Sequence, residues 1–253
     1  MLKKLLAVFL ALVLCVNPAF ATWTFIAAKN VAGTNGGTTG QVDYHLADFL
    51  VVCVSSGGTA PTLTDSSSNS WGSPLVTVTN GTGYKTGIYY KQAPSVSSTQ
   101  TFTITGAGTF SSLVVMGFSG SVASPLDQNN GGSNNTGSTT IASVSLAPQF
   151  ANELVIQCLG MADSGGSAIT IGTSGGTYTI PANGIAAASG ANEGVAGAYL
   201  VQGAATATSP TWTDSNTGVT GLNSVGLSFK TATSAAQGKI GRASCRERVY
   251  VLV

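Results

Sequence analysis

The stretch Gln100-Thr-Phe-Thr-Ile-Thr105 alternates strictly between polar and apolar side chains. Successive side chains of a β-strand point to opposite faces, so this pattern predicts a half-buried strand with Phe102 and Ile104 toward a core. A second stretch, Pro74-Leu-Val-Thr-Val-Thr79, has the same pattern. Uninterrupted apolar runs, typical of central strands covered on both faces, occupy Phe49 to Val54, Leu113 to Met116 and Leu154 to Ile156.

Patterns typical of α-helices are missing from the chain after the first 21 residues. After residue 21, no window combines apolar residues at i, i+3, i+4 and i+7 with capping residues, and Thr, Ser, Val and Gly dominate. Asn-Gly pairs at 80–81, 130–131 and 183–184 mark turns. We therefore predict that residues 22–230 form one all-β domain, a β-sandwich of antiparallel strands. The length of this stretch is ordinary for a single domain of this class.

The chain also matches itself once. Ala47-Asp-Phe-Leu-Val-Val52 aligns with Ala151-Asn-Glu-Leu-Val-Ile156, and Thr101-Phe-Thr103 aligns with Thr211-Trp-Thr213. Two such units are too few for a solenoid, so we expect two halves that close on each other as one sandwich, for which a jelly-roll-like arrangement is one form. The alignment makes Leu50 and Leu154 equivalent; convergent strand composition is the alternative explanation.

The two ends of the sequence differ from its body. Met1 to Ala21 has Lys3 and Lys4 before an apolar run, and ends in small residues, which predicts a signal peptide cleaved before Thr22 and an extracellular or periplasmic location. Residues 231–238 read as a polar linker. Ile240 to Val249 matches the translation of a sequencing adapter, so we expect residues 239–253 to be a non-native tail; a natural basic tail is the alternative.

The body of the chain is weakly acidic. Between residues 22 and 238, four lysines stand against eight Asp and Glu residues, which gives a net charge of −4. Nothing here favours nucleic acid or an anionic membrane as a partner. The apolar run in the first 21 residues is shorter than the roughly 20 residues of a transmembrane helix.

Residue types that carry catalysis are scarce. His45 is the only histidine, and it could pair with Asp43 or Asp48, but no G-x-S-x-G motif accompanies it. Glycoside hydrolysis needs two facing carboxylates, and Glu153 and Glu193 are the only glutamates of the body. Ordinary strand and loop positions explain them better, so we expect no catalytic residues and no enzymatic activity.

Two further sets of residues suggest sites. Asp65, Asn69 and Asp214 place oxygen-bearing side chains in turns and are weak candidates for calcium, although Asx-turns explain them without a metal; we expect no cofactor. Cys53 and Cys158 lie on apolar strands of an exported chain, where a disulfide is allowed. The repeat alignment puts them on opposite strand faces, so a bridge and two buried thiols both stay open.

Aromatic side chains are the candidates for ligand binding. Tyr84, Tyr90 and Trp71 could stack on the rings of a glycan, whereas core packing is the ordinary role of such residues. Tyr89 and Tyr90 are neighbours on a predicted strand, so one should face the core and the other the surface.

Several short segments resemble secreted bacterial and phage-associated β-sandwich domains. The segments that carry the likeness are Asp48-Phe-Leu-Val-Val52, Thr64-Asp-Ser-Ser-Ser-Asn-Ser-Trp71, Ile88-Tyr-Tyr90, Phe118-Ser-Gly120, Ser124-Pro-Leu-Asp127 and Asn152-Glu-Leu-Val155. The resemblance implies a jelly-roll or related sandwich with an extracellular or virion-surface role, and it implies no established activity.

We therefore expect a non-enzymatic structural or adhesive domain of a cell-surface, matrix or virion assembly, whose partner is a glycan or another surface protein. A carbohydrate-binding module that uses exposed aromatic side chains is the alternative. A secreted glycoside hydrolase is the third reading.

Overall fold

A computed structural model describes residues 22–59, 61–81, 83–134, 138–162, 168–187, 193–215 and 221–231. This part of the chain is all-β, with antiparallel sheets and no helix, as predicted. The expected signal peptide, the expected non-native tail and all of the expected linker except Thr231 lie outside the described residues.

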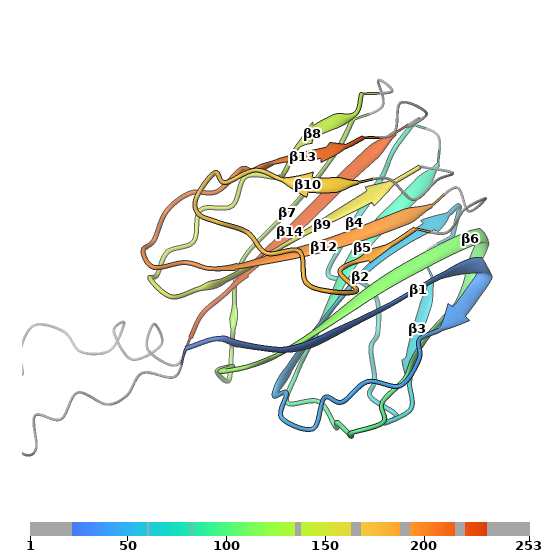
Figure 1. Cartoon of the computed structure of the whole chain (residues 1–253), viewed down its shortest axis with the longest axis horizontal. Helices are drawn as coiled ribbons and strands as arrows, with labels where there is room; N and C mark the ends of the chain where they lie inside the picture. Colours follow the sequence, from blue (N-terminus) through green and yellow to red (C-terminus); the bar gives the residue numbers. More distant parts are fainter. Residues whose placement is uncertain are drawn as a thin grey trace, which may run out of the picture.

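The first half of the chain forms one sheet (Figure 1). Its strands are β1 (Thr24–Thr38), β2 (Phe49–Gly57), β3 (Thr62–Asp65), β4 (Val76–Thr79), β5 (Tyr84–Gln92) and β6 (Phe102–Ser119). They pair in the order β1-β6-β2-β5-β4, and β3 pairs with the beginning of β6. β2 is central and is buried along nearly its whole length, as its apolar run predicts.

The second half forms two sheets. Its strands are β7 (Leu126–Asn134), β8 (Thr140–Ala142), β9 (Leu154–Met161), β10 (Ile169–Ile171), β11 (Ile185–Ala186), β12 (Gly194–Val201), β13 (Thr211–Asp214) and β14 (Leu222–Phe229). Five of them pair in the order β11-β12-β9-β14-β7, and β8, β13 and β10 make a small separate sheet. β9, like β2, is fully buried in the centre of its sheet.

Three apolar clusters hold these layers together. The central cluster lies between the two large sheets and includes Phe49, Phe118 and Phe229. A second cluster covers the outer face of the β9 sheet, with the fully buried Trp212 of β13 over it. A third covers the outer face of the β2 sheet and includes Phe102 and Ile104, the residues that the alternating stretch predicts to be buried. Burial of both faces explains why apolar residues dominate on both faces of β2 and β9.

The strand order of the two large sheets is the same. β7, β9, β11, β12 and β14 take the places that β1, β2, β4, β5 and β6 take in the first sheet. The chain completes one large sheet before it begins the other, which differs from a jelly roll, where the chain passes repeatedly between two sheets. A repeat in the amino-acid sequence itself stays a prediction.

The residue alignment of β2 with β9 is wrong by one position. Leu50 faces the outer cluster of its sheet, whereas Leu154 faces the central cluster. In the observed ladders Phe49 pairs with Phe118 of β6, and Leu154 pairs with Phe229 of β14. Phe49 and Leu154 are thus the corresponding positions, and a shift of one residue exchanges the two faces of a strand.

The two large sheets approach closely because small residues face the centre. A Cβ atom at Gly160 of β9 would lie 1.7 Å from the Oγ1 of Thr86 on β5. A Cβ at Gly197 of β12 would lie 2.9 Å from the Cε of Met116. The start of β1 and the end of β14 meet at one end of the sandwich (Figure 1), where the Trp23 indole donates to the Phe229 carbonyl at 3.2 Å.

Candidate functional site

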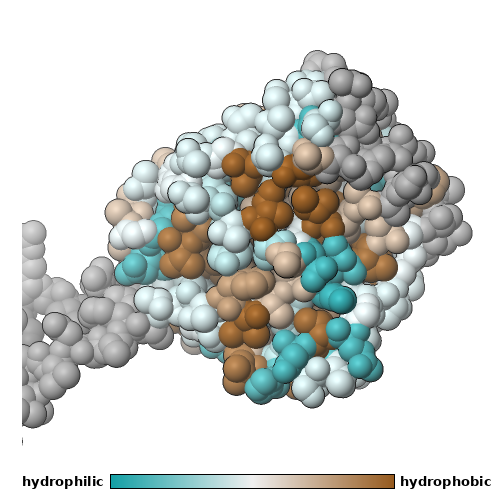
Figure 2. All heavy atoms as spheres, viewed as in Figure 1, coloured by the Kyte–Doolittle hydropathy of each residue, from teal (hydrophilic) through white to brown (hydrophobic). Residues whose placement is uncertain are grey.

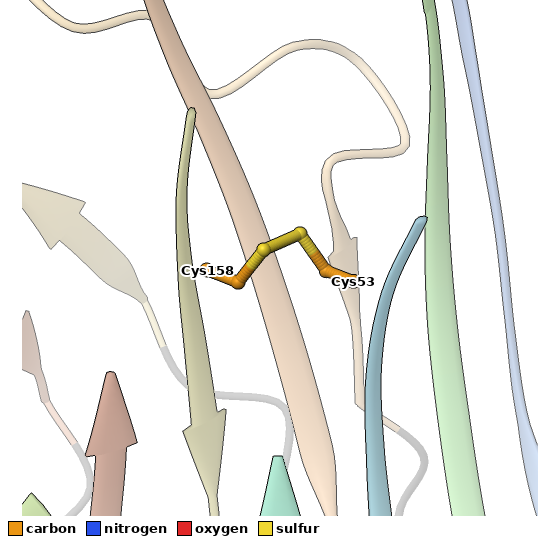
Figure 3. Close-up of a disulfide and its surroundings, with 2 residues drawn as sticks. All are labelled: Cys53 and Cys158. Carbon is orange, nitrogen blue, oxygen red and sulfur yellow. A yellow bond between two sulfur atoms is a disulfide. The ribbon is translucent and has the colours of Figure 1, made fainter. Parts of the chain in front are cut away.

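A disulfide joins the two large sheets through the central cluster (Figure 3). It links Cys53 of β2 with Cys158 of β9, whose Cα atoms are 5.8 Å apart, and both side chains are fully buried. The two cysteines face each other because the correct strand register places both on the inner faces, so the sequence argument for opposite faces is wrong. Beside them, Gly197 leaves room for the bridge: its Cβ would lie 3.3 Å from the Cys53 sulfur.

A pocket of about 260 Å³ lies at the end of the sandwich where the first half of the chain passes into the second. The residues that line it come from the end of β5, the connection between β6 and β7, and the position after β14: Tyr90, Gln92, Ala123, Ser124, Pro125, Leu126 and Lys230. Its volume is near the lower end of the range for small-molecule sites, which suits one ring-sized group.

Hydrogen bonds fix the connection that forms one wall of this pocket. The Asp48 carboxylate accepts the N–H groups of Gly120 at 3.0 Å and of Ser121 at 3.2 Å. The Gln92 amide donates to the Val122 carbonyl, and the Lys230 N–H donates to the Pro125 carbonyl at 2.7 Å. The wall is therefore held in place before any ligand binds, which lowers the entropy cost of binding.

Tyr90 is the one predicted ligand-binding residue that lines the pocket. Its ring packs against Phe49 and Phe229, with centroid distances of 5.7 and 5.2 Å, and its remaining surface is partly exposed. The adjacent Tyr89 is buried with 1% of its surface exposed, and its hydroxyl donates to the Pro61 carbonyl at 2.9 Å. The two tyrosines lie on opposite faces of β5, as expected, but both faces are covered: Tyr89 belongs to the outer cluster, and Tyr90 packs, partly buried, against the central one.

Tyr84 and Trp71 do not line the pocket beside Tyr90. Tyr84 begins β5 and Tyr90 lies six residues further along, a distance of about 20 Å in an extended strand. Trp71 packs against Tyr89 and Phe102 on the outer face of the sheet and is only 9% exposed. The prediction that Trp71 binds a ligand is therefore wrong, because its ring is part of a core cluster.

The Asp65 carboxylate is occupied by hydrogen bonds within its own turn. It accepts the N–H groups of Ser67 at 3.0 Å and Asn69 at 3.1 Å through Oδ1. Its Oδ2 accepts the Asn69 amide at 2.9 Å and the Trp71 indole at 2.8 Å. Asp214 lies in β13, in a different sheet, so the three weak calcium candidates do not come together. Within the described ranges, no three His, Cys, Asp or Glu side chains gather as a metal site would require.

Asp43 and His45 form an exposed pair. The His45 Nδ1 lies 2.5 Å from the Asp43 Oδ1, and each side chain is about half exposed, at 55% and 53%. The hydrogen bonds from His45 lower the pKa of Asp43. Asp48 is not part of this pair, because its carboxylate is directed to Gly120 and Ser121.

Glu153 is buried at the start of β9, close to the pocket end of the sandwich. Its Oε1 accepts the Phe150 N–H at 3.0 Å. Burial is the main cause that raises the pKa of Glu153, and the nearby Asp127 carboxylate adds to it. Asp127 itself accepts the Gln149 N–H at 3.0 Å, so both carboxylates hold the turn that precedes β9.

Glu193 lies at the opposite end, between the two large sheets. It is 2% exposed, and its Oε1 fills the space beside Gly57, where a Cβ would lie 2.7 Å away. Burial raises the pKa of Glu193 to about 7. β9 and β12 are antiparallel, so Glu153 and Glu193 are separated by about eight residues of strand, roughly 26 Å. They cannot flank one glycosidic bond, which requires carboxyl groups about 5 to 10 Å apart.

Sequence reasoning did not find most of the pocket. Gln92, Ser124 and Lys230 lie far apart in the chain, and no spacing rule connects the end of one strand with a connection and the end of another. The one available signal was Ser124-Pro125 between two predicted strands, which marks a rigid turn at the middle of the chain.

Comparisons with models of protein families, with curated proteins and with solved structures found no match. Across the part of the chain that the structure describes, there is no helix of the length and apolar character needed to cross a membrane. The class of molecule that the fold defines is an all-β, disulfide-linked sandwich.

Proposed function

We propose that this protein is a non-enzymatic extracellular domain with a structural or adhesive role in a cell-surface, matrix or virion assembly. The observation that supports this most is the buried disulfide between the two large sheets, because such bonds persist in oxidising compartments outside the cytoplasm. Three stacked apolar clusters and fixed connections favour a rigid scaffold. Strongly hydrophobic side chains form separate groups on the face in Figure 2, among neutral and hydrophilic ones.

The test asks first whether the chain is exported and then whether the exported product assembles. The full-length gene is expressed in a bacterium with a secretion pathway, and the exported product is identified by N-terminal sequencing and by counting free thiols. Electron microscopy of the purified product should show filaments, coats or attachment to cell surfaces. A product that keeps Met1 and stays in the cytoplasm, or an exported one that remains dispersed and attaches to nothing, contradicts the proposal.

A carbohydrate-binding role is the second candidate, and the pocket at Tyr90 favours it. A partly exposed aromatic ring beside an amide, a hydroxyl and an ammonium group is the combination that sugar hydroxyls and their apolar ring faces require. Binding to a glycan array that is lost in Tyr90→Leu but kept in Tyr84→Leu would support this role. Equal binding by both variants would contradict it.

A further inference from the structure

The pocket carries the opposite charge to the body of the chain. Four lysines and eight Asp and Glu residues give the body a net charge of −4. Of the described residues that line the pocket, one is a lysine and none is Asp or Glu. The Lys230 side chain therefore makes the pocket locally positive in a chain that is otherwise acidic.

Lys230 is placed by its neighbours. Its N–H is bound to the Pro125 carbonyl, and its Nζ lies 5.9 Å from the centre of the Phe150 ring, within cation–π distance. Among the described residues it forms no ion pair, although the chain has an excess of carboxylates. Asp127, at the start of β7, and Glu153, which precedes β9, accept the N–H groups of Gln149 and Phe150. Within the described residues, therefore, no carboxylate is paired with the Lys230 ammonium group at the pocket.

We infer that the pocket selects a sugar ring that carries an anionic group, a carboxylate or a sulfate, over the uncharged sugar. The inference rests on the carbohydrate-binding role proposed above and adds the substrate class to it. In this arrangement Tyr90 contacts the ring, Gln92 and Ser124 bind hydroxyl groups, and Lys230 binds the anion. A single charge–charge contact at an accessible site corresponds to a preference of about three- to fivefold.

The experiment is an amide NMR titration of the exported chain with three matched probes. These are methyl glucoside, methyl glucuronide and methyl glucoside 6-sulfate, which differ only at C6. We expect both anionic probes to bind about three- to fivefold more tightly than the neutral one, with shifts at Gln92, Ser124 and Lys230. Added salt should reduce this preference, because it screens accessible charges. A comparison of the two anionic probes shows whether the pocket prefers a carboxylate or a sulfate.

Two variants separate selectivity from folding. Lys230→Gln should bind all three probes equally. Lys91→Gln, whose lysine lies on β5 and donates to the Ser70 carbonyl at 3.2 Å, should keep the preference. The thermal midpoint of each variant shows whether it is folded. Equal affinity of the wild type for the three probes at the pocket overturns the inference but leaves carbohydrate binding standing. No shift at the pocket with any probe overturns both.

Discussion

Glu193 keeps a carboxyl group between two packed sheets, and this makes the stability of the domain depend on pH. The pKa of Glu193 rises from 4.5 to about 7 because burial disfavours its charged form. A raised pKa in the folded state means that its stabilising contribution is complete below pH 4.5 and is lost as the pH rises through 7. The loss amounts to about 3 kcal/mol at alkaline pH, at about 1.4 kcal/mol for each pKa unit.

We therefore expect Glu193→Gln to raise the free energy of unfolding at pH 8 by up to about 3 kcal/mol and to change it little at pH 4. Glutamine keeps the shape of the side chain beside Gly57 but cannot ionise. Urea denaturation of both proteins at the two pH values measures the difference. If the variant is no more stable than the wild type at pH 8, the carboxyl group is not confined between the sheets as described. Glu153, whose pKa is also raised, remains in both proteins and does not affect the comparison.

The Asp65 carboxylate is the organising group of the turn that follows β3. It accepts four hydrogen bonds, including one from the Trp71 indole. Asp65→Ala should lower the free energy of unfolding by about 2 to 4 kcal/mol, because it leaves several donors without an acceptor. Asp43→Ala, at an exposed side chain, is the control and should lower the stability much less than Asp65→Ala. Denaturation midpoints measure both; similar small losses would mean that the turn forms without its carboxylate.

At the scale of the strands, β2 and β9 are buried on both faces but by different clusters. Leu50 and Leu154 are both fully buried, the first in the outer cluster and the second in the central one. Truncation to alanine should cost about 2 to 5 kcal/mol at each position. Leu46→Ala, at a side chain that is 63% exposed, should cost less than about 0.5 kcal/mol. A near-zero shift of the denaturation midpoint at Leu50 or Leu154 would contradict the burial of that strand.

These two leucines also show how far sequence reasoning reaches. Alternation and apolar runs locate β2, β6 and β9, because strand periodicity depends only on neighbouring residues. The relative register of β2 and β9 depends on the lengths of loops, and an alignment by residue type misplaced it by one residue. That single step exchanged the faces of the strands and hid the pairing of Cys53 with Cys158. The pocket was missed for a related reason: its walls are the ends of elements that only tertiary packing brings together.

For the whole molecule, the disulfide ties the first half to the second. It closes a loop with a sequence separation of 105 residues. Loop-closure entropy gives a stabilisation of about 4 to 5 kcal/mol for a loop of this length. The double variant Cys53→Ala, Cys158→Ala should therefore unfold at a much lower denaturant concentration than the oxidised wild type. A midpoint equal to that of the wild type would show that the bond contributes nothing, and the reduced wild type serves as the control without a change of sequence.

The same bond sets how far the domain can be stretched. When the two ends of the chain are pulled apart, the segment between Cys53 and Cys158 stays closed by a covalent bond even after every hydrogen bond has broken. An extended chain spans about 3.5 Å per residue. The 105-residue loop that the bond closes therefore contains about 370 Å of contour length that cannot extend while the bond is intact. In single-molecule pulling, the reduced protein should lengthen by about that much more than the oxidised one. A surface tether built from such domains would have a short, fixed reach under load for as long as its surroundings remain oxidising.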